Sequence, residues 1–387
     1  MTRTSVNGVE AHPTNLDRLA AFLRPLQKGP FARADFECLT ARSSENGDLL
    51  LDTARVMKAF GLGTGPDQWA LLHQAEVTDD IVAYLSSVLG PADLILGMEL
   101  PTPLFLALKK AGYRVMDFGI SPIRFTPELT FEIRSTDADL YRHIGDYALP
   151  DATILRAVTS LSGLARRDAQ NGPRIAELGR VGVIFGQTAL DTSLIQGEGM
   201  FDMRMAEDQI RSWAAPLDTV LYKTHPFHED LQTPQFLQDV CGKVQVTTFP
   251  TYQLLSYDNV TDALAISSGT LIEATYFGVR PQALMTPPRW KAREFHHLAV
   301  TSDLLSPASI MRLLGAGEDE ICPDKGPDLR LSFGGWGDQE KVIVFQCRSV
   351  ASLARSRRAR RIRAFVKKYL AGAIVSLIAA YFLLGRV

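Results

Sequence analysis

Residues 180–285 alternate short apolar runs with segments of helical spacing, and this alternation restricts the fold more than any other feature of the chain. Strands separated by helices in this way form parallel sheets whose faces are covered by the helices. The pattern predicts a doubly wound α/β domain, which binds its ligands at the carboxyl ends of its strands. The expected strands are 180–185, 219–223, 244–249, 263–267 and 282–285, and the expected helices are 203–214, 233–241 and 270–277.

The preceding part of the chain repeats this pattern once. An apolar run at 93–97, a helical segment at 103–111 and a second run at 113–118 predict a parallel β-α-β unit. A chain of 387 residues is long enough for two domains. We therefore expect an α/β fold in which two Rossmann-like domains face a central cleft. The expected parts are an N-terminal arm at 1–45, a first domain at 46–175, a second domain at 176–350 and a tail at 351–387.

The tail joins a basic segment to an apolar one. Residues 355–368 hold eight basic side chains and no acidic one, and 369–385 is an uncharged apolar stretch of 17 residues. A helix of that length spans about 25 Å, close to the bilayer core of about 30 Å. The basic segment would stay on the cytoplasmic side and attract anionic lipids. The tail could cross the bilayer, lie in its interface or dock on the protein as a buried helix; its nearly continuous apolar surface favours attachment to the membrane.

The rest of the chain is acidic. When the nine basic residues of the tail are set aside, 32 basic residues remain against 43 acidic ones. Binding to nucleic-acid phosphates needs clustered Lys and Arg side chains. We therefore expect no nucleic-acid partner.

The segment 262–281, DALAISSGTLIEATYFGVRP, places hydroxyl groups where an expected strand ends and a helix begins. The start of a helix carries unpaired N–H groups and a partial positive charge, so Ser267, Ser268 and Thr270 are candidates to bind a phosphate there. Gly269 would let the phosphate approach the backbone, and Glu273 could accept hydrogen bonds from ribose hydroxyls. Alternatively, Ser and Thr simply cap the helix.

A second candidate segment, 221–226 (LYKTHP), ends an expected strand in His225-Pro226. Pro226 would fix the turn and present His225 to the cleft. A histidine at that place can donate a hydrogen bond to a phosphate oxygen and stabilise the charge that develops on a leaving phosphate group.

Two acids follow expected strands in the two domains. Asp191 lies in 185–194 (FGQTALDTSL), and Glu99 lies in 96–101 (LGMELP). Glycosyl transfer uses two carboxylates that face one cleft, one at the anomeric carbon and one at the acceptor proton. Each acid could instead be a helix cap or a structural acid. Asp137-Ala138-Asp139 has the DxD spacing of metal-binding sugar transferases, but we expect it to begin a helix, where acids are favoured by the dipole.

These segments together resemble a known family. GMELPTPLFLALKKAGYRVMDFGISPIRF, continuing through FEIRS, is similar to the N-terminal region of the capsule-type and O-antigen-type β-Kdo transferases. GQTALDTSLI, KTHP and ISSGTLIEATYFGVRP resemble successive motifs of their C-terminal domain, so the resemblance covers roughly 93–285. The His-Pro and Ser-Ser pair is shared with bacterial sialyltransferases and polysialyltransferases and points to a CMP-linked donor, while the other motifs narrow the sugar towards Kdo.

The resemblance implies a GT-B-like enzyme that transfers Kdo from CMP-β-Kdo with retention. Asp191 would be the nucleophile, Glu99 the acid/base, and His225 a contact of the CMP phosphate. Arg124 and Arg134 would be candidates for the sugar carboxylate or for domain packing. The residues implied to bind the donor are Gln187, His225, Pro226, Ser267, Ser268, Gly269, Thr270 and Glu273. A CMP-sugar has a single phosphate, so no metal and no cofactor is expected.

The expected partners are a CMP-sugar and a lipid-linked or glycan acceptor of capsule or lipopolysaccharide synthesis, at the cytoplasmic face of the inner membrane. Two enzymatic alternatives use the same CMP cradle: a sialyltransferase-like enzyme and a CDP-glycerol-type transferase. A third alternative is an inactive, membrane-tethered scaffold of a polysaccharide assembly complex.

Overall fold

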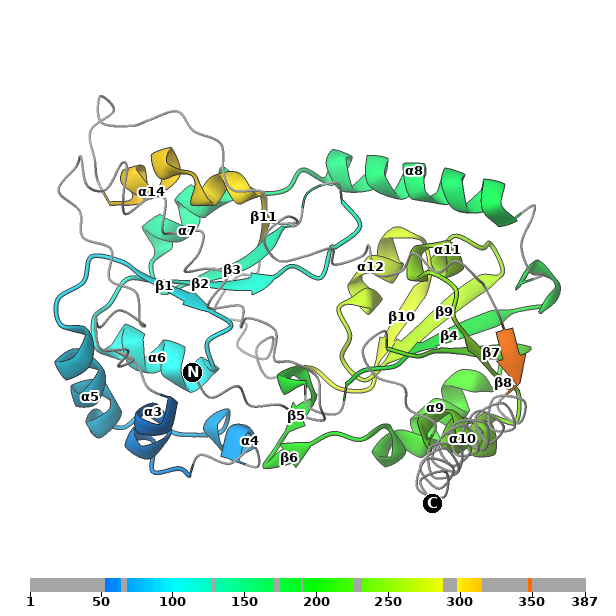
Figure 1. The fold of residues 1–387 in the computed structure, drawn as a ribbon, viewed down its shortest axis with the longest axis horizontal. Helices are drawn as coiled ribbons and strands as arrows, with labels where there is room; N and C mark the ends of the chain where they lie inside the picture. Colours follow the sequence, from blue (N-terminus) through cyan, green and yellow to red (C-terminus); the bar gives the residue numbers. More distant parts are fainter. Residues whose placement is uncertain are drawn as a thin grey trace, which may run out of the picture.

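The computed structural model describes residues 53–63, 68–126, 128, 130–169, 175–188, 191–225, 232–287, 298–314 and 347–349. Within these ranges two larger β-sheets lie side by side, each with its own helices, and a third sheet has only two strands (Figure 1). The expected arm at 1–45 and the basic and apolar tail at 351–387 lie outside the described residues. In the described part of the chain, no helix has both the length and the apolar character needed to cross a membrane.

The larger sheet has six strands in the order β10-β9-β4-β7-β8-β12. The first five are mutually parallel, and β12 is antiparallel to β8. This confirms the expected α/β class and its parallel sheet. The strands are β4 (Val181–Phe185), β7 (Thr219–Lys223), β8 (Val244–Thr247), β9 (Val260–Ala265), β10 (Arg280–Ala283) and β12 (Cys347–Ser349).

Helices cover both faces of this sheet because the side chains of its buried strands alternate between two cores. Ile184 and Leu264 join one core with α9 (Glu207–Ala214) and α10 (Gln232–Cys241). Val183, Ala263 and Ala265 join the other with α11 (Thr251–Leu255) and α12 (Thr270–Tyr276). The expected helix 203–214 begins as a 3-10 turn, η3 (Met203–Ala206), before α9.

The smaller sheet has four strands in the order β1-β2-β3-β11, which are Ile95–Met98, Val115–Ile120, Phe131–Ser135 and Leu298–Val300. β1 and β2 are parallel and joined by α6 (Thr102–Lys110), so the expected β-α-β unit is confirmed. The rest of the sheet is antiparallel, unlike a Rossmann-like domain. The physical reason is that the connection 121–130 is too short for a helical crossover and returns the chain alongside β2.

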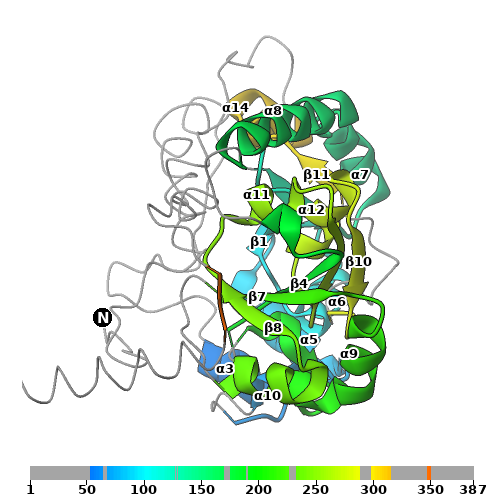
Figure 2. The ribbon, with the colours of Figure 1, turned by 90° about the vertical axis from the view of Figure 1, so that its right-hand side faces the viewer.

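Five further helices accompany this sheet; three of them contribute side chains to its two cores, whereas the helix at 68–72 contacts the segment 199–200. They are α3 (Thr53–Ala59), α4 (Gln68–Leu72), α5 (Asp79–Leu89), α7 (Ala138–Gly145) and α8 (Asp151–Ala169). α8 differs, because it leaves the smaller sheet and runs along α11 and α12 of the larger one (Figures 1 and 2).

The expected boundary that assigned 176–350 to one domain is wrong for residues 298–314. β11 pairs with β3, and η4 (Ser302–Leu305) and α14 (Pro307–Leu313) follow it on the same sheet. Val300, Leu304 and Ile310 are buried in a core with Phe131 and Ile133 of β3. The return of the chain therefore covers an open strand edge and completes the first core.

Candidate active site

Three loops that follow neighbouring strands meet at the carboxyl edge of the larger sheet. β9, β4 and β7 are adjacent and parallel, so the loops that begin at 266, 186 and 224 leave the sheet side by side. The N–H of Gly186 donates to the carbonyl oxygen of Lys223 at 2.9 Å. A Cβ on Gly186 would lie 2.5 Å from the Tyr222 hydroxyl and 3.3 Å from the backbone nitrogen of His225. Gly186 thus lets the first loop lie against the backbone of His225.

Gln187 ties the loop after β4 to the loop after β9. Its Oε1 accepts a hydrogen bond from the backbone N–H of Ser267 at 2.8 Å, and its Nε2 donates to Ser267 Oγ at 3.2 Å and to Ser193 Oγ at 3.4 Å. Ser267 Oγ in turn donates to the carbonyl oxygen of Ser193 at 3.0 Å. We refer to Gln187, Ser193 and Ser267 as the amide–serine cluster; it joins two of the site segments, 185–194 and 262–281, by their polar groups.

Asp191 lies next to this cluster. It caps the short 3-10 helix η2 (Thr192–Leu194), where its Oδ1 accepts from the backbone N–H of Ser193 at 2.9 Å. The side chain of Asp191 is partly exposed. Its loop continues into the β5–β6 hairpin (Ile195–Gln196 and Gly199–Met200), and Gln74 near α4 donates to the carbonyl oxygen of Gly197 at 3.2 Å. Asp191 is therefore fixed by contacts at both ends of its loop.

The segment 267–270 turns from β9 into α12 as expected, with partly exposed side chains on Ser268 and Thr270. The N–H of Thr270 donates to Ser268 Oγ at 3.3 Å. A Cβ on Gly269 would lie 2.9 Å from Cβ of Pro122, a residue of the smaller sheet's loop. The missing side chain at Gly269 therefore admits Pro122, which differs from the expected approach of a phosphate. Pro226 lies outside the described residues.

Glu273 links the two sheets, in place of the expected contact with ribose hydroxyls. Its side chain is 3% exposed, and its Oε1 accepts hydrogen bonds from the backbone N–H of Arg124 at 2.8 Å and from the Tyr252 hydroxyl at 3.0 Å. Phe125, the next residue, packs edge-on against the rings of Tyr252 and Phe277. The α12 face that bears Glu273 thus packs against the loop after β2 and is closed to a ligand.

We expect Glu273→Ala to lower the free energy of unfolding by about 1–3 kcal/mol, because two buried donors lose their acceptor. Tyr252→Phe removes one donor together with its need for a partner, so it should cost less. Chemical denaturation of the three proteins measures both values. Equal stabilities of Glu273→Ala and the wild type would show that the link contributes nothing.

Glu99 lies at the edge of the smaller sheet, opposite the three loops of the larger sheet. It follows β1, and its N–H donates to the carbonyl oxygen of Phe118 in β2 at 2.7 Å. Because β1 and β2 are parallel, Glu99 and the loop with Pro122 leave the same edge of the smaller sheet. The contacts of that loop with Gly269 and Glu273 set this edge against the carboxyl edge of the larger sheet (Figure 1). Glu99, which is exposed, and Asp191 therefore come from two edges that face each other.

The Arg134 side chain is not available to bind a ligand at the two facing sheet edges. Its side chain is fully buried and its Nε lies 2.6 Å from Asp117 Oδ2. The expected role of Arg134 as a contact of the sugar carboxylate is therefore excluded by its burial. Its contacts lie within the smaller half, with Asp117, Leu100 and Thr102.

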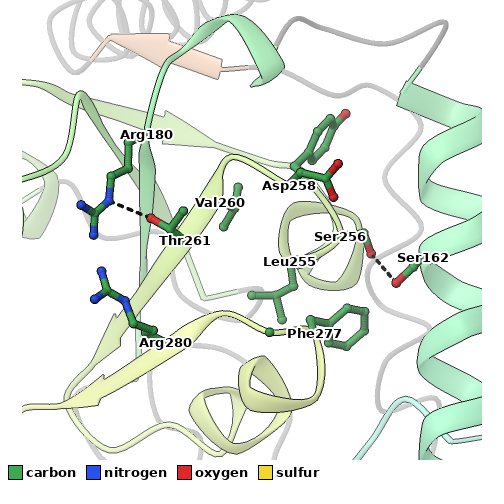
Figure 3. Close-up of a pocket in the computed structure, with 11 residues that line it drawn as sticks. Ser162, Arg180, Leu255, Ser256, Asp258, Val260, Thr261, Phe277 and Arg280 are labelled. Carbon is green, nitrogen blue, oxygen red and sulfur yellow. Dashed lines mark hydrogen bonds between the residues drawn. The ribbon is translucent and has the colours of Figure 1, made fainter.

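A separate cavity of about 530 Å³ opens at the amino ends of β4, β9 and β10, at the far edge of the larger sheet (Figure 3). Its two arginines, Arg180 and Arg280, both pair with Asp262, at 3.1 Å and 2.7 Å. Parallel α/β sheets bind their ligands at the opposite edge. None of the expected site residues lines this cavity, which we assign to the junction between α8 and the sheet.

The segment Asp137-Ala138-Asp139, which has the DxD spacing, lies at the start of helix α7, as expected. Asp137 caps α7, and its Oδ1 accepts from the N–H groups of Asp139 at 2.7 Å and Leu140 at 3.0 Å. Burial alone would raise the pKa of Asp137, but these hydrogen bonds and the nearby Arg114 hold it below its ordinary value. Among the described side chains, no three of His, Cys, Asp or Glu are grouped so that they could hold a metal ion.

Sequence reasoning missed three residues of this region: Ser193, Pro122 and Asp117. Ser193 could have been recognised from the sequence, since it is a hydroxyl residue two positions after a candidate nucleophile. Asp117 could have been recognised as well, because an acid inside an otherwise apolar strand must find a buried partner. Pro122 could not, since only the tertiary fold brings it to Gly269.

Comparison with family models and with curated proteins yields no match for this chain. Among solved structures, a chain described as Thermosulfurimonas dismutans KpsC, beta Kdo 2,7 transferase, aligns at 16% sequence identity with a TM-score of 0.32. The alignment covers 60% of this chain and 76% of that chain. A TM-score of this size does not establish a common fold, so the likeness bears on neither the architecture nor the activity of this protein.

Proposed function

We propose that this protein is a glycosyltransferase that takes its sugar from a CMP-linked donor, with Kdo from CMP-β-Kdo as the donor and retention as the outcome. The observation that carries the proposal is the meeting of three loops at the carboxyl edge of a parallel sheet, where Gln187 joins Ser267 and Ser193 beside Asp191. The edge of the second sheet, with Glu99, faces this one, which supports a GT-B-like arrangement of two halves around the donor.

The donor's phosphate would lie between the loops after β7 and β9. His225, Ser268 and Thr270 are partly exposed there and can donate hydrogen bonds to phosphate oxygens. Such donors are preorganised by the loops and stabilise the negative charge that grows on CMP as it leaves. Because CMP carries one phosphate, these groups can suffice without a divalent cation. We expect transfer to be unchanged by EDTA.

The reaction proceeds in two displacements. In the first, a carboxylate oxygen of Asp191 forms a bond to the anomeric carbon, and the bond from that carbon to the phosphate oxygen breaks with its electrons on CMP. In the second, the acceptor hydroxyl oxygen attacks the same carbon, the carboxylate of Asp191 leaves, and the acceptor proton passes to Glu99. Two inversions give net retention.

The acceptor in this proposal is lipid-linked or a saccharide, and the protein works at the cytoplasmic face of the inner membrane. The basic residues of 355–368 followed by the apolar 369–385 support this assignment, since they combine attraction to anionic headgroups with apolar burial. No cofactor enters the proposed reaction.

Incubation of the full chain with radiolabelled CMP-Kdo, regenerated in situ, and a lipid-linked saccharide tests the proposal. Labelled product and released CMP are expected. Release of CMP with CMP-sialic acid alone would instead favour a sialyltransferase, and a glycerophosphate product from CDP-glycerol would favour that transferase. If no group is transferred from any of these donors although the protein still binds CMP, the scaffold role is favoured.

We expect Gln187→Ala to weaken CMP binding about tenfold, because the loops after β4 and β9 lose the hydrogen bonds that hold Ser267 in place. Isothermal titration of CMP measures the change. Gln235→Ala is a suitable control, since Gln235 is exposed on α10 and its amide donates to Asp239 Oδ1 of the same helix at 3.1 Å. Equal affinities of wild type and Gln187→Ala would remove the amide–serine cluster from the nucleotide site.

A further inference from the structure

A buried ion pair lies directly behind Glu99. Asp117 in β2 and Arg134 in β3 are opposite each other in the strand register, and both side chains are fully buried. The guanidinium group of Arg134 also lies over the ring of Phe105, 4.5 Å from its centre. Removing two charges from water is costly, and such a pair contributes little net stability over apolar residues of similar size. Its presence therefore suggests a role other than stability.

The pair binds the backbone that follows Glu99. Asp117 Oδ1 accepts from the N–H of Leu100 at 3.0 Å, and Arg134 Nη2 donates to the carbonyl oxygen of Leu100. Arg134 Nη1 donates to Thr102 Oγ1 at 3.1 Å, at the start of α6. The backbone N–H and the backbone carbonyl of Leu100 are thus both held by the ion pair, together with the first turn of the next helix.

The backbone of Glu99 itself is unusual. Its φ is +52°, and it is the one non-glycine residue in the described ranges with a positive φ. Residues with a Cβ rarely adopt this conformation, because the Cβ crowds the neighbouring carbonyl. It persists where the surroundings impose it. Here the hydrogen bond from the Glu99 N–H to Phe118 holds the preceding side, and the ion pair holds the following side.

We infer that Asp117 and Arg134 are positioning residues that impose the left-handed backbone of Glu99 and thereby direct its carboxylate to the facing edge of the larger sheet. The inference rests on the proposed function only for what Glu99 does there, namely accept the acceptor proton. The imposed conformation is a property of the fold and can be tested without any substrate.

The substrate-free test compares Glu99→Gly with Glu99→Ala by thermal melting. Glycine adopts a positive φ without penalty, so Glu99→Gly should melt about 2 °C above Glu99→Ala. In a Thr102→Val background, where one contact of Arg134 is lost, this difference should shrink. If Glu99→Gly melts at or below the temperature of Glu99→Ala, the imposed conformation is absent and the inference is overturned.

The kinetic test uses Arg134→Lys and Thr102→Val in the transfer assay. We expect kcat to fall about tenfold, while the KM for the CMP-sugar and the affinity for CMP stay unchanged, because the nucleotide is held by the other sheet. Arg134→Lys keeps the charge and should retain more activity than Arg134→Met. Thr136→Val is the control, since the Thr136 hydroxyl makes its hydrogen bonds to Val115 and Tyr113 at the amino end of β2, the end remote from Glu99.

These outcomes separate the inference from the proposed function. If the wild type transfers sugar and Thr102→Val and Arg134→Lys both match its kcat, the positioning role is wrong although the enzyme assignment stands. If the wild type transfers no sugar from any CMP-linked donor, the proposed function is wrong, and the melting comparison still decides whether the ion pair imposes the conformation of Glu99.

Discussion

Asp191→Asn should reduce sugar transfer by about 10³-fold or more while the affinity for CMP stays within twofold of the wild type. An amide oxygen is a far weaker nucleophile than a carboxylate, so the glycosyl–enzyme bond would not form. The cap of η2 should survive, because Asn accepts the N–H of Ser193 as Asp does. Steady-state transfer assays and titration with CMP give the two values.

Asp202→Asn is a matched control for this substitution. Asp202 also caps a 3-10 helix, η3, and accepts from the N–H of Arg204 at 2.8 Å, but it lies outside the loops at the sheet edge. Its replacement should leave transfer unchanged. Full activity of Asp191→Asn would remove Asp191 from the reaction and leave the retaining mechanism without a nucleophile.

Arg134→Met should lower the free energy of unfolding by about 3–5 kcal/mol, because it leaves the carboxylate of Asp117 buried without its partner. The double variant Asp117→Leu/Arg134→Met should regain much of that loss, since it removes both buried charges. Denaturation by urea, followed by circular dichroism, measures all three proteins.

The exposed ion pair between Arg114 and Asp137 provides the comparison. Its N–O distance is 3.0 Å, but both side chains are partly exposed, so Arg114→Met should cost under about 1 kcal/mol. A loss from Arg134→Met as small as that from Arg114→Met would show that Asp117 is reached by water or re-paired. The difference between the two losses of unfolding free energy thus measures how much the burial of the Asp117–Arg134 pair adds to the cost of removing its arginine.

Four strands of the larger sheet, β4, β7, β8 and β9, were predictable because they are short, largely apolar and bounded by helical spacing. β12 was not expected, and β10 (Arg280–Ala283) is exposed and begins two residues before the expected 282–285. The expected strand 219–223 coincides with β7, and the expected 180–185 is one residue longer than β4. The strand expected at 263–267 begins earlier, at Val260, because Asp262 is accommodated within it by Arg180 and Arg280. In a sequence, an acid next to an apolar run indicates the end of a strand, because the partners that neutralise it cannot be identified from the sequence.

The smaller sheet was only half predictable. β1, α6 and β2 are consecutive, so their local pattern sufficed. The pairing of β3 with β11 joins segments that are far apart in the sequence, and no local signal marks such a pairing. The same limit applies to the site: positions after strands indicated Asp191, Glu99 and Ser267, whereas the packing of Glu273 against Arg124 depends on how the two halves meet.

The return of residues 298–314 to the first sheet has a consequence for how the chain is made. On the ribosome, β1, β2 and β3 emerge long before β11 and α14, so the first half cannot complete its core until the second half has been synthesised. Until then an unpaired strand edge and an apolar surface remain accessible to chaperones or to other nascent chains. A fragment that ends before residue 298 would keep that edge permanently.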